Sequence, residues 1–145
     1  MYTHEDFAAD VVRHFTFLES DYGMRREPLQ KGGIGSWVSY ATVDVKVVVE
    51  YEIGGYCSVS VQNLRHVKRD PLERSEFDLD EIIAVSGKRP QRRPDPRSMG
   101  EVVARAAETL RTIGAPVLQG DFEALHERQK KMAEAVRRHN PVTQQ

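Results

Sequence analysis

Apolar residues recur every three or four positions at the start of the chain. The repeat comprises Phe7, Val11, Phe15, Leu18 and Tyr22. Such spacing keeps these residues on one stripe of a helix, which has about 3.6 residues per turn. Thr3 and Asp6 have the spacing of a capping box, and Gly23 is free to take the left-handed conformation that ends helices. The pattern predicts a helix over residues 4–22.

From residue 43 onward the repeat changes to a period of two. The odd positions are mainly apolar: Val43, Val45, Val47, Val49, Tyr51 and Ile53. The even positions between them are mainly polar, and residues 57–62 repeat the alternation. Alternation of this kind is typical of strands with one buried face and one polar face. It predicts strands over 43–53 and 57–62.

The glycine pair between these strands leaves two loop lengths to compare. A two-residue loop at Gly54-Gly55 would set apolar residues opposite serines. A three-residue loop over 53–55 sets apolar residues opposite one another, pairing Tyr51 with Cys57, Val49 with Val59 and Val47 with Val61. A slip by one residue would expose a whole apolar face. We therefore expect the three-residue loop, with Gly55 in the left-handed bulge position.

Further strands are expected upstream. Residues 37–40 read Trp-Val-Ser-Tyr. A single strand over 36–53 would far exceed the usual length of about 5–6 residues, so a bend is expected near 41–44. Residues 24–29 contain Pro28 and fit only an edge strand. The prediction is an antiparallel meander of three or four strands.

The helical repeat returns after the sheet. Asp78 and Glu81 have capping-box spacing, and Phe77 can pack on Ile82 as a hydrophobic staple. This short helix ends by Gly87, where a proline-rich stretch begins.

Two more helices follow the proline-rich residues 87–97, which cannot form regular structure. Ser98 and Glu101 start the first of them, and Gly114 closes it. A last helix starts at Asp121. Its apolar stripe is narrow, so we expect it to lie across the surface.

The order of helix, strands and then three helices is typical of an α+β fold. We expect a single domain over 1–139, with a frayed tail over 140–145. The helices are expected to pack on one sheet face, which carries Val47, Val49, Tyr51, Val59 and Val61. The opposite face, left to solvent, carries Lys46, Glu50, Glu52, Ser58, Ser60 and Gln62.

Composition excludes several classes of protein. The 145 residues are 39% hydrophobic and 30% charged, which fits one globular domain rather than a disordered or membrane protein. The net charge of −1 does not favour a general polyanion binder. A single cysteine excludes a disulfide framework. Without a signal peptide or an apolar run of about 18 residues, a cytoplasmic location is expected.

No residue pattern indicates a catalytic or metal centre. The five histidines lack the spacing of three or four that places two metal ligands on one helix face. Cys57 falls on the buried face of its strand, where a thiol is a poor nucleophile. Glu50 and Glu52 fall on the polar face, which does not provide the burial that a catalytic carboxylate with a raised pKa requires. The glycine-rich residues 31–36 precede a strand rather than a helix, so we interpret them as a flexible connection and not a phosphate loop. No catalytic residue, metal or cofactor is predicted.

The loop within 87–97 is the main charge cluster. Its basic residues are Lys88, Arg89, Arg92, Arg93 and Arg97, against the single acid Asp95. One interpretation is a solvated linker stiffened by proline. The other is a binding site for phosphates or an acidic partner. The loop has no aromatic residue to stack on a base.

Three stretches resemble a set of small bacterial proteins. They are FTFLESDYG over 15–23, FDLDEII over 77–83, and GAPVLQGDF over 114–122. Some members of this set are similar to the immunity proteins that accompany bacterial polymorphic toxins. The resemblance implies a cytoplasmic neutralising or binding role without a cofactor or a catalytic residue.

The functional prediction is therefore a non-enzymatic protein that binds a protein partner, with a toxin as the partner that the resemblance implies. The predicted contact residues are Trp37, Tyr40, Lys46, Glu50 and Glu52. The alternative is binding of nucleic acid or an acidic partner through loop 88–97. The chain is expected to be a monomer or a weak homodimer associated through its last helix.

Overall fold

The computed structural model describes residues 1–66, 73–89 and 92–139 and has an α+β fold. The predicted tail over 140–145 lies outside the described residues. At the N-terminus, the expected single helix is two helices, α1 (His4–His14) and α2 (Thr16–Ser20). Thr3 caps α1 in the predicted capping box. The break at Phe15 lets Phe15, Phe17 and Leu18 all be buried, whereas one continuous helix would place Phe17 off the apolar stripe.

The sheet contains more strands than the alternation predicted. In the described chain it comprises β1 (Arg25–Arg26), β2 (Gln30–Gly32), β3 (Gly35–Ala41), β4 (Val45–Glu52), β5 (Tyr56–Asn63) and β6 (Glu76–Asp78). The order is β1-β3-β4-β5-β6, β2 also pairs with β3, and all pairs are antiparallel. The strands that the sequence missed or left open have two or three residues each, too few to show a period.

The register between β4 and β5 follows the predicted three-residue loop. Tyr51 pairs with Cys57, Val49 with Val59, and Val47 with Val61. Gly55 has a φ of 98°, in the left-handed region where a glycine is favoured. The predicted bend is the turn between Ala41 and Val45.

The glycine-rich residues 31–36 are a tight hairpin, not the flexible connection we expected. Gly32 pairs with Gly35 across the turn, and Gly33 has a φ of 58°. The Trp37 ring lies over Gly32, where an added Cβ would come within 3.2 Å of the ring. Gly33 therefore allows the tight turn, and Gly32 leaves room for the Trp37 ring to pack on the backbone.

The later helices begin where the caps predicted. Asp78 forms a capping box at α3 (Leu79–Ser86), Gly87 ends it with a left-handed backbone, and Ser98 caps α4 (Met99–Ile113). The chain then forms a further short helix, α5 (Ala115–Leu118), which the sequence did not predict. Helix α6 runs over Glu123–His139, slightly later than expected.

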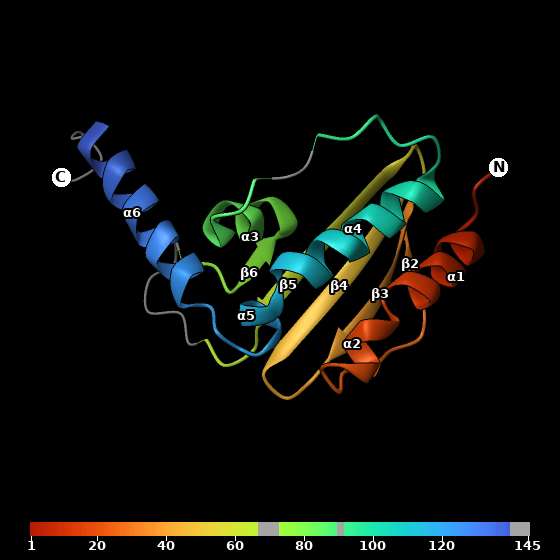
Figure 1. Cartoon of the computed structure of the whole chain (residues 1–145), viewed down its shortest axis with the longest axis horizontal. Helices are drawn as coiled ribbons and strands as arrows, with labels where there is room; N and C mark the ends of the chain where they lie inside the picture. Colours follow the sequence, from red (N-terminus) through yellow and green to blue (C-terminus); the bar gives the residue numbers. More distant parts are fainter. Residues whose placement is uncertain (67–72, 90–91, 140–145) are drawn as a thin grey trace.

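The helical layer packs on the predicted face of the sheet. In Figure 1, α4 crosses the sheet, with α1 and α2 beside it. The core includes the five expected sheet residues Val47, Val49, Tyr51, Val59 and Val61, all at most 4% exposed. The other face of β4 is only part-buried.

Helix α6 departs from its prediction. It extends away from the sheet rather than across the surface (Figure 1). Leu125 is buried, but Met132 and Val136 are 52% and 59% exposed. In the described chain, no helix combines the length and apolar character needed to cross a membrane.

Candidate functional site

The face of the sheet that points away from α4 is the first candidate site, and we call it the outer sheet face. Cross-strand pairing arranges it in rows: Trp37 beside Glu50 and Ser58, Ala41 beside Lys46 and Gln62, and Gly35 beside Glu52 and Tyr56. Trp37, Lys46, Glu50 and Glu52 are all part-exposed. The structure therefore brings four of the five predicted contact residues together.

Tyr40 does not belong to the outer sheet face. It lies three residues after Trp37 on β3, so it points to the opposite side, pairs with Val47 and is 0% exposed. Its hydroxyl makes no hydrogen bond of good geometry, although Arg26 lies close enough to offset part of the rise in its pKa. Burial, helped by the charge of Glu19, raises the pKa of Tyr40 to about 12. A partner cannot reach this side chain, so its prediction as a contact residue was wrong.

The structure brings together a serine and a histidine that the sequence did not connect. His4 Nδ1 lies 2.7 Å from Ser36 Oγ. Ser36 is 0% exposed, so a substrate cannot reach its hydroxyl. Burial also raises the pKa of Cys57 to about 11, which keeps its thiol protonated at neutral pH and weakly nucleophilic. These groups therefore offer no accessible nucleophile.

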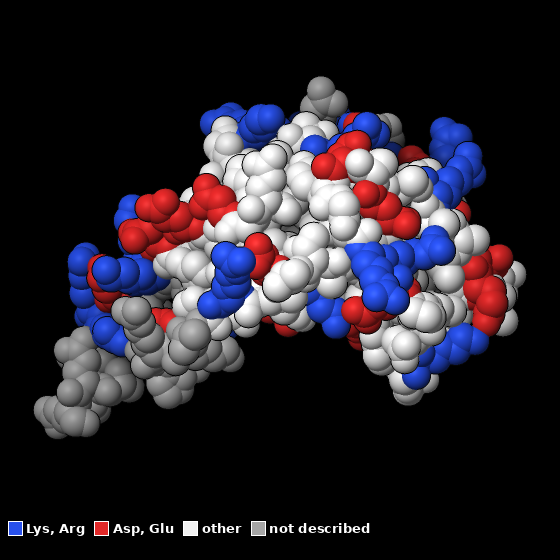
Figure 2. All heavy atoms as spheres, turned by 90° about the horizontal axis from the view of Figure 1, so that it is seen from below, with Lys and Arg blue, Asp and Glu red and all other residues white. Residues whose placement is uncertain are grey.

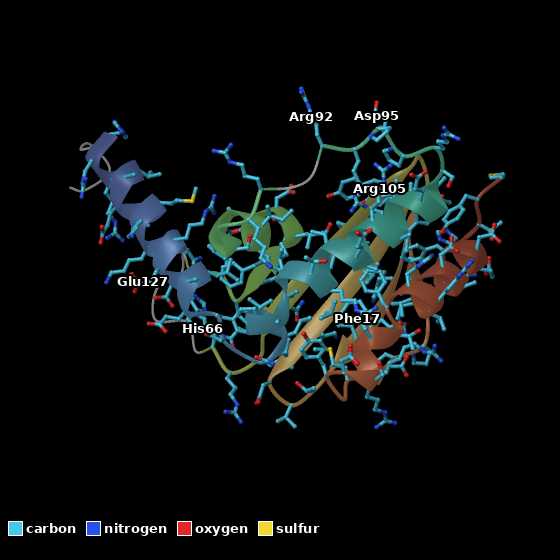
Figure 3. All side chains as sticks on the ribbon, in the orientation of Figure 1. Phe17, His66, Arg92, Asp95, Arg105 and Glu127 are labelled. Atoms are coloured by element: carbon cyan, nitrogen blue, oxygen red, sulfur yellow. The ribbon has the colours of Figure 1, made fainter. Side chains whose placement is uncertain are left out.

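A second polar cluster lies where β5 meets α6, and we call it the imidazole cluster. The rings of His66 and His126 are stacked, His66 Nε2 lies 3.0 Å from Glu73 Oε2, and Asn63 Nδ2 lies 3.3 Å from His126 Nε2. Burial lowers the pKa of His126, and the neighbouring His66 adds to that effect. Figure 3 shows His66 beside the start of α6. No sequence spacing could have revealed this pair, because only the folded topology joins its members.

Metal binding finds no support in this cluster. Within residues 1–66, 73–89 and 92–139, no group of three or more potential ligands is arranged to hold an ion. The cluster borders a hollow of about 670 Å³ lined by Asp44, Asn63, Arg65, His66, Glu73, Gln119, Gly120 and His126. The contacts of the imidazole cluster join the first turns of α6 to the end of β5.

The basic loop folds back on the helices. Lys88, Arg89 and Arg93 line a hollow of about 530 Å³ between α3 and α4. Arg92 instead points away from the body (Figure 3), and Arg97 is not part of the lining. The full lining is Ile83, Lys88, Arg89, Arg93, Arg105, Glu108, Thr109, Thr112 and Ile113, and we call this hollow the α3–α4 groove.

Arg105 is the groove residue that sequence reasoning missed. Its guanidinium donates hydrogen bonds to the Pro94 carbonyl at 2.6 Å and to Glu101 at 2.7 Å. Arg93 makes two bonds to Glu108, at 2.9 and 2.7 Å. These contacts hold the loop against α4, so the predicted basic residues do not form one continuous strip.

Comparison with known proteins adds no identity. No family model, no curated protein and no solved structure matches the chain. The resemblance to immunity proteins therefore stays a prediction. Figure 2 shows basic and acidic side chains interspersed on the face that it displays.

Proposed function

We propose that this chain is a non-enzymatic protein that binds a partner protein through its outer sheet face. The observation that carries the proposal is the part-exposed Trp37 on a sheet face whose β4 residues are also part-exposed. Tryptophan is enriched among the residues that dominate binding energy at protein interfaces. A rigid sheet also holds such a residue in place at low entropic cost.

The charges of the outer sheet face favour a protein over a polyanion. Glu50 lies directly beside Trp37, and Glu52 and Lys46 flank it along β4. These three groups carry one positive and two negative charges. A phosphate backbone would be repelled by the two carboxylates, whereas a protein surface of mixed charge can complement all three groups.

A protein toxin is the partner class that we propose. The support is the resemblance of residues 15–23, 77–83 and 114–122 to the set that includes immunity proteins. Neutralisation by binding needs an exposed rigid surface and no catalytic group, which agrees with a buried Ser36 and a protonated Cys57.

Binding of nucleic acid or an acidic partner by loop 88–97 is a less favoured proposal. Arg93 is already paired with Glu108, and Arg92 points in a different direction from the groove (Figure 3). A polyanion site would need these charges to act together along one surface.

Affinity capture from lysate of the source cells tests the proposal. We expect the wild-type chain to retain a defined protein, which is then purified and titrated. Trp37→Ala should weaken that purified complex by at least about 2 kcal/mol, the range typical of an interface hot spot. Glu50→Lys should weaken it further, because it reverses the charge next to Trp37.

The matched control is Met132→Ser, at an exposed apolar residue on α6. Its complex should have wild-type affinity. If Met132→Ser weakens binding and the two outer-face variants do not, the proposed interface is wrong. Circular dichroism of each variant checks that the fold is intact.

A further inference from the structure

The α3–α4 groove has an unusual balance of charge for a chain of net charge −1. Its lining includes four cationic side chains, Lys88, Arg89, Arg93 and Arg105, and one carboxylate, Glu108. Glu101, outside the lining, pairs with Arg105. In the described part of the chain, Lys88 and Arg89 pair with no carboxylate. The groove therefore keeps a positive charge that its own carboxylates do not neutralise.

Two of these cations are held in position. Arg93 is fixed by its two bonds to Glu108, and Arg105 is fixed by Glu101 and the Pro94 carbonyl. Arg105, whose orientation is already set, loses less conformational entropy when an anion binds beside it, whereas Arg93 must leave Glu108 to reach the anion. Lys88 and Arg89 are exposed, and the long side chain of Lys88 can turn its point charge toward an anion in the groove.

The rest of the lining adds apolar and hydroxyl groups. Ile83 from α3 and Ile113 from α4 are part-buried, and Thr109 and Thr112 lie along the same side of α4. A volume of about 530 Å³ falls within the range of small-molecule sites, roughly 300–1,000 Å³. Such a groove suits a compact ligand with an anionic end and an apolar or planar end.

We propose that the α3–α4 groove binds a small organic phosphate. Lys88 and Arg89 contact the phosphate, and the isoleucines contact the apolar part. Arg93 joins them when the ligand competes with Glu108. This site is separate from the outer sheet face and does not depend on a protein partner. A single-stranded nucleic acid is disfavoured because Arg92 points away from the groove (Figure 3) and Arg97 is absent from its lining.

Calorimetric titration of the full chain with adenosine monophosphate and with inorganic phosphate tests the proposal. We expect the monophosphate to bind more tightly than inorganic phosphate, because only the monophosphate has an apolar part for Ile83 and Ile113. Lys88→Gln combined with Arg89→Gln should weaken its binding by about tenfold or more, the usual effect of losing charge-assisted hydrogen bonds.

The control and a gain-of-binding variant make the test specific. Arg92→Gln removes one charge from the same loop outside the groove, so binding should change by less than about twofold. Glu108→Gln removes the competing carboxylate, so binding should tighten by a few-fold. Equal losses in Arg92→Gln and in the groove variant would mean unselective attraction and would overturn the proposal.

Two other outcomes would also overturn it. The first is no binding of the monophosphate at millimolar concentration. The second is binding of a ten-nucleotide oligothymidylate that is tighter than the monophosphate and is weakened by Arg92→Gln, which would favour a nucleic-acid surface. Neither outcome bears on the outer sheet face, so the two proposals fail independently.

Discussion

The imidazole rings of His66 and His126 are stacked with their centroids 4.3 Å apart. The Phe77 ring meets the His126 ring edge-on, with the two centroids 5.2 Å apart. Asn63, at the end of β5, contacts His126, and Glu73 contacts His66. The pair thus joins α6 to the sheet. Protonation of His126 is disfavoured, because burial and the neighbouring His66 both lower the pKa of His126.

Acidification is expected to weaken the fold through His126. Burial lowers the pKa of His126 in the folded chain. In the unfolded chain a histidine has a pKa of about 6.5, so the unfolded chain binds a proton more readily than the folded chain. The stability contribution is fully present above that pH. It is lost as the pH falls through that value toward the lower pKa of the folded state.

Urea unfolding at a series of pH values measures this effect. His126→Gln should flatten the dependence of unfolding free energy on pH in the acid range. His14→Gln, outside the imidazole cluster, should keep the wild-type dependence. Since the Glu73 carboxylate faces His66, only the difference between the two variants is diagnostic. Identical profiles for both variants would rule out His126 as the source.

Removal of the Tyr40 hydroxyl is expected to cost no stability. The hydroxyl is buried and makes no hydrogen bond of good geometry, although Arg26 lies close to it, so Tyr40→Phe deletes a desolvated polar group and keeps the ring. Tyr40→Ala should instead cost about 3–5 kcal/mol, because it leaves a cavity in the core. Thermal and urea unfolding check both values. A large loss for Tyr40→Phe would mean that the hydroxyl has a partner.

Gly114 and Gly33 are expected to respond differently to alanine. A Cβ at Gly114 would lie 2.5 Å from the Leu110 carbonyl oxygen and 2.7 Å from Leu110 Cδ1, so Gly114→Ala should cost about 2 kcal/mol or more. Gly33 has open space around it but a positive φ, so Gly33→Ala should cost about 1–2 kcal/mol. Urea unfolding measures both losses. A smaller loss at Gly114 than at Gly33 would contradict this order.

Arg105 is expected to protect the proline-rich loop from proteolysis. Arg105→Gln removes the charged clamp between Glu101 and the Pro94 carbonyl. Since this ion pair is near the surface, global stability should change by at most about 1 kcal/mol. Trypsin should nevertheless cut faster after Arg92. Arg128→Gln on α6 is the control, and equal cutting in both variants would show that Arg105 does not hold the loop.

Local signals in the sequence predicted the parts of the fold that depend on neighbouring residues. The caps at Thr3, Asp78 and Ser98 were confirmed because each bonds within its own first turn. The register at Gly55 was confirmed because apolar pairing and turn geometry agree there. Strands as short as β2 and β6 have no measurable period, so they could not be predicted.

The residues of the candidate sites were harder to predict, because many of their contacts join residues far apart in the sequence. Strand parity predicted that Lys46, Glu50 and Glu52 share one face, whereas Trp37 and Tyr40 were predicted contacts because aromatic residues anchor interfaces. Parity applied from Trp37 would have assigned Tyr40 to the core. The contacts of Arg105 with the loop and of His66 with His126 arise only from tertiary packing. A single sequence gives no signal for such contacts.

Photo-crosslinking from position 37 tests the central claim most directly. A benzophenone amino acid replaces Trp37 in one variant and Met132 in a matched variant, and each is irradiated in the source cells. The account predicts one defined protein adduct from position 37 on the outer sheet face and none from position 132 on α6. Adducts from position 132 with none from position 37 would contradict it.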